Sequence, residues 1–335
     1  MKTRLLTAFL VVSCVSTLAA ETYEIERWAV GAVGLGWAGF GAALAGPTEY
    51  LINPAGLADA EWPNIAANYF SQMEVYYDEN VEKNRTRENI YCFGLSYIKP
   101  MRSESATLSK EVTIGTLAVS LHQLFYSDKH YERIYFQNYN NDYSESLAII
   151  SFGSRVSGNF AYGLNIKALS VESIDYADNG FGLDLGVQFS TGMFYAGFSV
   201  NNAIPPGISL NNNNRLYDDR TLRFGIGLTD IKEVTHSISQ SVIKPSVGLD
   251  IRYQPSITDF NCGIYGEIKT QNVDGTLGMK FGGSISIFEK VASLYGSLFS
   301  NVVEIQLCIG GTLAPEKDEP DLINSCFSFI FIPDF

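Results

Sequence analysis

The sequence has few cationic residues, with 23 Lys and Arg against 36 Asp and Glu, and its formal net charge is -13. This balance argues against nucleic acid as a partner, because phosphate binding requires clustered Lys and Arg. It argues equally against docking on an anionic membrane surface by charge. Charged residues of both signs make up only 18% of the chain, whereas hydrophobic residues make up 46%.

Motifs for catalysis and metal binding are also missing. His122, His130 and His236 are the only histidines, and their positions do not match metal-ligand spacing. The sequence has no CxxC pair, and no GxSxG, phosphate-binding or dinucleotide fingerprint stands between a strand and a helix. We therefore expect a protein that is not an enzyme and that carries no cofactor and no metal.

Cysteine is scarce as well, with five residues in the chain. Without Cys14, which lies in the N-terminal apolar run, the remaining four are Cys92, Cys262, Cys308 and Cys326. An even number in an exported chain permits disulfides. These four are widely spaced, however, and each lies in an apolar strand pattern, which favours buried or lipid-facing thiols. The disulfide state stays open.

The N-terminus has the features of an export signal. Lys2 and Arg4 precede an apolar run at residues 5–15, and small residues at 16–20 allow cleavage after Ala19 or Ala20. We expect residues 1–20 to be a signal peptide. Two alternatives are an uncleaved membrane anchor, for which the run is short, and lipidation at Cys14.

What the chain does contain is a long series of alternating segments. From residue 181 to residue 190, every odd position is large and apolar and every even position is polar or Gly. A strand has a period of two, so one face collects all the apolar side chains. About fourteen such segments run from residues 63–78 to residues 322–335. The connections between them are expected to be loops, among them an outer loop at residues 203–216 and a longer connection at residues 230–242. Many Tyr, Phe and Gly residues are also typical of sheets.

The predicted fold class is all-β: a closed antiparallel transmembrane β-barrel of about fourteen strands, formed by residues 63–335. Most segments reach the roughly 9–11 residues that a tilted strand needs to cross a bilayer. An even strand number fits a bacterial barrel. The alternative is a water-soluble sandwich or propeller, whose apolar face would point into a core. The Gly-rich polar face, with its mixed charges, favours the barrel.

Aromatic residues end the chain at alternate positions. This pattern resembles the signal by which outer-membrane barrels are recognised by the barrel-assembly machinery, and the alternative is that these residues face a soluble core. Lipid exposure suits them, because in hydrocarbon only closure removes the unpaired edge of a sheet. The residues of this assembly signal are Phe327, Phe329, Phe331 and Phe335.

Charged residues recur on the polar face of the segments, which would line the lumen of a barrel. Buried charges are usually paired, because an isolated ion is costly in a low-dielectric site. The set is expected either to rigidify the barrel as paired charges or to form a polar path for a solute. Its members are Asp184, Arg223, Asp250, Arg252, Glu267, Lys269 and Lys280.

Residues 21–62 are rich in Gly and Ala, and residues 28–48 contain no charge. A transmembrane helix is one alternative there, although six glycines make a weak helix. At residues 53–56 the run leads into Asn53, Pro54, Ala55 and Gly56, where Pro54 favours a turn. Together with the alternating segments that follow, this motif resembles the N-terminal signature of the long-chain fatty-acid transporter (FadL-like) barrels and their PorV-type relatives.

That resemblance implies a fourteen-strand barrel of the bacterial outer membrane, with residues 21–62 folded inside it as a plug, or hatch. The alternative is a loop that merely starts the first strand. The resemblance further implies transport of hydrophobic or amphipathic, fatty-acid-like small molecules. The other possibilities are a PorV-like binding module for protein secretion or surface attachment, and a structural surface antigen. Expected partners are outer-membrane lipid and either a hydrophobic ligand or a secreted protein.

Overall fold

The structure, a computed structural model, describes the chain from residue 50 to residue 331 with gaps, together with Ala42. The described ranges are residues 50–78, 83–105, 110–126, 144–173, 176–210, 214–217, 220–228, 234–236, 241–253, 258–272, 275–286, 291–300, 303–312 and 321–331. The expected signal peptide, most of the Gly-rich run and Phe335 lie outside these residues.

Nearly all of the described chain is antiparallel β-sheet, which confirms the all-β expectation. The strands of the main sheet that have eight or more residues are β1 (Asn64–Asp78), β2 (Lys83–Ser105), β3 (Lys110–Tyr126), β4 (Ser144–Ser157), β5 (Phe160–Ser173), β6 (Tyr176–Thr191), β7 (Phe194–Ile204), β10 (Thr221–Leu228), β12 (Ser241–Tyr253), β13 (Thr258–Asn272), β14 (Gly275–Ser286), β15 (Val291–Ser300), β16 (Val303–Thr312) and β17 (Asp321–Phe331). Short strands are β8 (Gly207–Leu210), β9 (Asn214–Tyr217) and β11 (Val234–His236).

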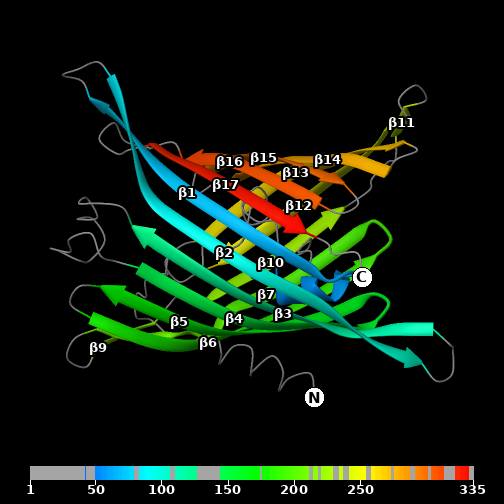
Figure 1. Cartoon of the computed structure of the whole chain (residues 1–335), viewed down its shortest axis with the longest axis horizontal. Helices are drawn as coiled ribbons and strands as arrows, with labels where there is room; N and C mark the ends of the chain where they lie inside the picture. Colours follow the sequence, from blue (N-terminus) through cyan, green and yellow to red (C-terminus); the bar gives the residue numbers. More distant parts are fainter. Residues whose placement is uncertain are drawn as a thin grey trace.

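Neighbouring strands of the main sheet follow the order β10-β7-β6-β5-β4-β3-β2-β1-β17-β16-β15-β14-β13-β12-β11. The first and last strands of the sequence series lie side by side, because β1 pairs with β17 from Ile65↔Phe331 to Val75↔Asp321 (Figure 1). β10, at one end of this order, also pairs with β12 near the other end, from Leu222↔Tyr253 to Leu228↔Val247.

The alternation in the sequence located these strands closely. Each expected segment overlaps an observed strand, from β1 to β17. The described residues nevertheless hold seventeen strands rather than fourteen. One reason is that the connection at residues 203–216, which was expected to be a loop, contains the β8–β9 hairpin. The other is that the connection at residues 230–242 contains β11, which pairs with β12 beyond the end of β10.

Burial along the strands is the reverse of that in a water-soluble protein. In β5, Phe160 and Ile166 are exposed, at 40% and 52%, whereas Asn165 and Lys167 are buried, at 0% and 3%. The exposed apolar face is here called the outer wall, and the opposite face the inner wall. A soluble sandwich would bury the apolar face instead. A polar interior and an apolar exterior are what a barrel in hydrocarbon requires.

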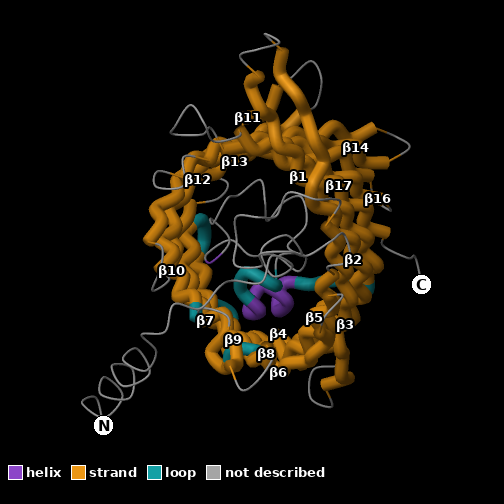
Figure 2. The backbone as a smooth tube through the Cα atoms, turned by 90° about the vertical axis from the view of Figure 1, so that its left-hand side faces the viewer, coloured by secondary structure: helices purple, strands orange, loops and turns teal. Residues whose placement is uncertain are grey.

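The inner wall surrounds the short 3-10 helix η1 (Pro54–Asp59), which is purple in Figure 2. The part of the chain that the structure describes has no helix long and apolar enough to cross a membrane. Residues 50–60 therefore lie beside β3 to β6 on the inner wall.

The outer wall should tolerate a charge poorly. Ile166→Arg is expected to destabilise the protein by about 2–4 kcal/mol if this position lies near the middle of the hydrocarbon. Equilibrium urea unfolding in phospholipid vesicles, followed by tryptophan fluorescence, measures the change. Ile166→Leu is the control, because it keeps the apolar surface. An Arg variant as stable as the Leu variant would mean that this wall does not face lipid.

Candidate functional site

The segment of residues 50–60, here called the plug, lies against the inner wall of β3 to β6. Asn53 begins η1 as its N-cap: its Oδ1 accepts a hydrogen bond from the Ala55 amide at 3.1 Å, and its backbone carbonyl accepts one from the Gly56 amide at 3.0 Å. Pro54 follows in the first turn, where its missing N–H costs nothing. All four residues of the motif are buried.

Three glycines on adjacent strands leave the space in which the plug lies. Gly153 in β4, Gly163 in β5 and Gly186 in β6 are register partners. A Cβ at Gly163 would overlap the Pro54 carbonyl and lie 2.6 Å from the Ala55 nitrogen, and one at Gly186 would overlap the Asn53 side chain. These glycines permit a close approach of two backbones, which is a common reason for Gly inside a strand.

The amide group of Asn53 also joins the plug to its surroundings. Its Nδ2 donates to the carbonyl oxygen of Ala42 at 2.6 Å and to that of Val187, in β6, at 3.2 Å. Asn53 is fully buried, so each of these bonds satisfies a group that water does not reach. One side chain therefore caps η1, holds an earlier residue of the chain and contacts the wall.

Two asparagines of the wall bind the residues that precede the motif. Asn165 Nδ2 donates to the Tyr50 carbonyl at 3.1 Å, and Asn201 Nδ2 donates to the Leu51 carbonyl at 2.9 Å. The Tyr50 hydroxyl donates to Ser96 Oγ at 3.3 Å. Burial raises the pKa of Tyr50 above its ordinary value, so this phenol remains a protonated donor at neutral pH.

A buried ion pair lies behind these asparagines. Lys167 Nζ is 2.9 Å from Asp184 Oδ1, and the two side chains are 4% and 2% exposed. Asp184 also accepts from Asn165 Nδ2 at 3.1 Å, and its Oδ1 accepts from the backbone amide of Asn202 at 2.8 Å. Lys167 donates to the Asn202 side-chain oxygen. Such extra hydrogen bonds are what make a buried charge pair tolerable.

Asn202 lies in an irregular part of β7. Its φ is +57°, a left-handed conformation that Asn adopts more readily than most residues, and the β6–β7 register shifts between Leu183 and Leu185. The chain then crosses the inner wall of β6, where Gly180 and Gly182 leave room for Pro206 and Gly207. This inward turn replaces the outer loop that the sequence predicted at residues 203–216.

The far end of the plug has contacts of its own. Arg155 in β4 pairs with Asp59 and donates to Ser190 Oγ at 3.1 Å. Burial raises the pKa of Asp59, and Arg155 opposes that shift. Just beyond the plug, Arg102 in β2 donates to the Glu61 carbonyl at 2.6 Å, and its guanidinium lies 4.9 Å from the centre of the Trp62 ring.

Of the polar residues predicted for the lumen, Asp184 lies in this network. Arg223 is half-buried in β10, opposite Ser199 and Arg252 in the strand register. The register also pairs Glu267 with Lys280, Asp250 with Gly225 and Lys269 with Gly278. The side chains of Asp250, Arg252, Glu267, Lys269 and Lys280 lie outside the described part of the structure.

The sequence did not predict Asn165, Asn201 and Asn202 as site residues, because polar residues in strands give no distinctive signal.

The aromatic residues of β17 lie on the outer wall. Phe327, Phe329 and Phe331 are exposed, whereas Ser328 and Ile330 between them are buried. Phe335, the fourth residue of the expected assembly signal, lies outside the described residues.

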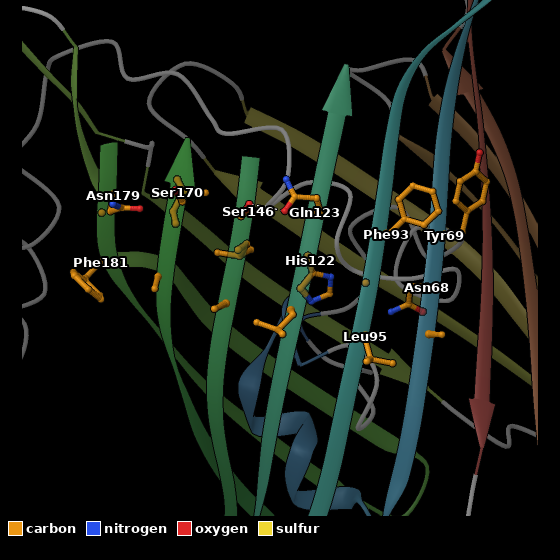
Figure 3. A pocket seen from close by; sticks show the side chains of 18 of the residues that line it. Asn68, Tyr69, Phe93, Leu95, His122, Gln123, Ser146, Ser170, Asn179 and Phe181 are labelled. Atoms are coloured by element: carbon orange, nitrogen blue, oxygen red, sulfur yellow. Dashed lines mark hydrogen bonds between the residues drawn. The ribbon is translucent and has the colours of Figure 1, made fainter. Parts of the chain in front are cut away.

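A groove of about 960 Å³ crosses the outer wall from β17 and β1 to β6 (Figure 3). Bulky Phe93 and Leu95 rise on one side and Phe181 on the other, and the small Ala148 and Ala168 lie between them. The outward-facing row above Ala148 and Ala168 is polar, and within it Ser146 Oγ donates to a side-chain oxygen at 2.6 Å. That row contains Gln123, Ser146, Ser170 and Asn179.

No protein-family model matches this sequence, and no curated protein matches it. Among solved structures, the TodX monoaromatic hydrocarbon channel deltaS2 mutant matches 93% of this chain and 100% of its own, with a TM-score of 0.56 and 11% identity. The toluene transporter TodX from Pseudomonas putida matches 83% of this chain and 92% of its own, with a TM-score of 0.51 and 10% identity.

The fold is that of TodX. The shared feature is the arrangement of an outer-membrane β-barrel. At identities of 10–11%, a shared fold does not imply a shared activity. The TodX-like fold agrees with the apolar outer wall and the polar inner wall.

Among the described residues, no three His, Cys, Asp or Glu side chains gather as a metal site.

Docking of the plug should depend on the strand glycines. Gly163→Ala is expected to weaken it by about 1–3 kcal/mol, because the new methyl group overlaps the Pro54 carbonyl. That loss corresponds to roughly 5- to 150-fold faster hydrogen exchange at the Ala55, Gly56 and Ala60 amides. Gly158→Ala is the matched control, since nothing lies within 4 Å of that position. Equal exchange in the two variants would contradict a glycine-dependent docking.

The buried ion pair should be strongly coupled. Asp184→Asn leaves the Lys167 charge buried without a carboxylate partner, and is expected to cost about 3–5 kcal/mol of unfolding free energy. Adding Lys167→Met should cost less than the sum of the two single changes. A double-mutant cycle by urea unfolding in detergent measures this coupling. Strict additivity would show that the two residues act independently.

Proposed function

We propose that this protein transports hydrophobic or amphipathic small molecules across a bacterial outer membrane, through a closed barrel of fourteen strands. The pairing of β10 with β12 supports closure, since it joins the two ends of the strand order. In this proposal β8 and β9 form an inward hairpin, and β11 extends the edge beside β10. The assembly residues of β17 would direct the chain to the barrel-assembly machinery.

The observation that carries the proposal is a plug held inside the ring of strands. The plug is docked by glycine contacts, by single hydrogen-bonding side chains and by one small apolar cluster, in which Tyr50, Leu57 and Ala60 pack against Ile98 and Ala118. A contact of this limited size can break while the wall stays intact. A barrel of this size without a plug would leave an open lumen. The arrangement therefore suits controlled passage better than catalysis or a purely structural role.

The nature of the cargo is suggested by the inner wall beyond the polar network. At that level most of the buried inward side chains are apolar, although Glu145 and His122 are buried among them. The band consists of Phe70, Leu124, Leu147, Leu169 and Val171. An apolar band favours a hydrophobic cargo, because apolar surface gains by leaving water. TodX, which has this fold, is described as a toluene transporter.

Outer-membrane lipid is the proposed partner of the outer wall. The groove over Ala148 and Ala168 fits acyl chains, and its polar row fits the boundary between hydrocarbon and headgroups. Along β5, the apolar outer residues extend from Phe160 to Ala168 before Ser170 begins the polar row. A tilted strand of that length spans most of the apolar band, about 25 Å tall, that is usual for outer-membrane barrels.

An uptake assay tests transport, in cells that lack other channels for hydrophobic compounds. Expression of the full chain is expected to raise the initial uptake of labelled toluene or of a long-chain fatty acid several-fold, with no change for a labelled sugar. Asp184→Asn is expected to alter the rate, because it disturbs the network that holds the plug.

Ile166→Leu serves as the control, since it changes only the outer wall. Cells with the protein in the outer membrane but with no gain for either hydrophobic compound would contradict transport. A stoichiometric protein partner that co-purifies with this protein from the same cells in detergent would favour the binding-module alternative instead.

A further inference from the structure

The strand register brings two of the cysteines together. Cys308 in β16 stands directly opposite Cys326 in β17. They are 18 positions apart in the sequence and lie in the last two strands of the chain. Neither their spacing nor their surrounding residues distinguish them from Cys92 and Cys262, so the relation exists only in the folded sheet.

Directly opposed residues of an antiparallel pair have Cα atoms about 4.5–5.5 Å apart. Disulfides span Cα separations of about 4.4–6.8 Å, so the backbone at this position is already within reach of a bridge. Residues paired across a ladder also share one face of the sheet. In β17, Ser328 and Ile330, which stand two and four positions after Cys326, have buried side chains.

In the described strands, neither Cys92 nor Cys262 stands opposite another cysteine. Cys92 is separated from Cys326 by Phe70, which pairs with both, so the two lie two strand spacings apart, about 9.6 Å. This exceeds the span of a disulfide. Cys262 is opposite Leu249 and Ile285. Cys92 is buried as a free thiol.

We propose that Cys308 and Cys326 form a disulfide in the exported protein. The oxidant is a disulfide-bonded protein oxidoreductase of the oxidising compartment. One cysteine thiolate attacks the oxidant's disulfide, forming a mixed disulfide and releasing one oxidant thiolate. The second cysteine, as its thiolate, then displaces the other oxidant sulfur. The protein thus loses two electrons and two protons, and the oxidant becomes a dithiol.

Such a bond would fix the register of the C-terminal hairpin. β17 pairs with β16 on one side and with β1 on the other, so a slipped β17 would misplace the pairing of the first strand as well. A slip of one residue would also exchange the outer Phe residues with Ser328 and Ile330. The disulfide would close a loop that spans 18 sequence positions, from Cys308 to Cys326, and would exclude such slips.

Differential thiol labelling of the exported full chain tests the proposal. Protein from outer membranes is denatured with N-ethylmaleimide without reductant, then reduced and treated with iodoacetamide. Cys92 and Cys262 are expected to carry maleimide, and Cys308 and Cys326 acetamide. A digest made without reduction should contain one cross-linked peptide that includes both residues. These measurements on the unaltered chain need no folded variant.

Two variants sharpen the test. Cys308→Ser should leave Cys326 modified by maleimide, whereas Cys92→Ser should leave the labelling of Cys308 and Cys326 unchanged. Maleimide on all four cysteines of the unaltered chain would overturn the proposal. A cross-link from Cys308 to any residue other than Cys326 would overturn it equally.

Discussion

The close approach of the plug backbone to the bare backbone at Gly163 is the contact on which the interior is organised. Because Gly153 and Gly186 flank it in register, the plug meets three strands at once with no wall side chain at the contact points. A proline-containing turn fits this slot, since Pro54 presents a compact, conformationally fixed unit. The polar residues around the slot then have defined positions from which to bind the plug.

Asp184 connects the residues that bind the plug to the surrounding wall. Its carboxylate binds Lys167 and Asn165 of β5 and the backbone of Asn202 in β7. The left-handed turn at Asn202, which interrupts the ladder, is therefore stabilised by a charge on the neighbouring strand. A buried carboxylate is costly by itself, and these donors, which include the Asn202 amide in the irregular part of β7, are what make it tolerable.

Much of the wall could be predicted from the sequence. The period-two alternation located most of the long strands to within a few residues, because an apolar outer wall and a largely polar inner wall give neighbouring positions opposite characters. The prediction failed at residues 203–216, where the β8–β9 hairpin turns inward. Asn, Gly and Pro are typical of loops, and nothing in their order shows that this segment would cross the inner wall of β6.

The sequence by itself determined the class of the fold and the Asn-Pro-Ala-Gly motif, because both depend on local pattern and local turn chemistry. Only the tertiary structure decided what the motif touches. Gly153, Gly163 and Gly186 lie in three strands, and Cys308 and Cys326 in two, so their proximity is a property of the register. Register is set by the pairing of all the strands around the sheet, and no local stretch of sequence contains it.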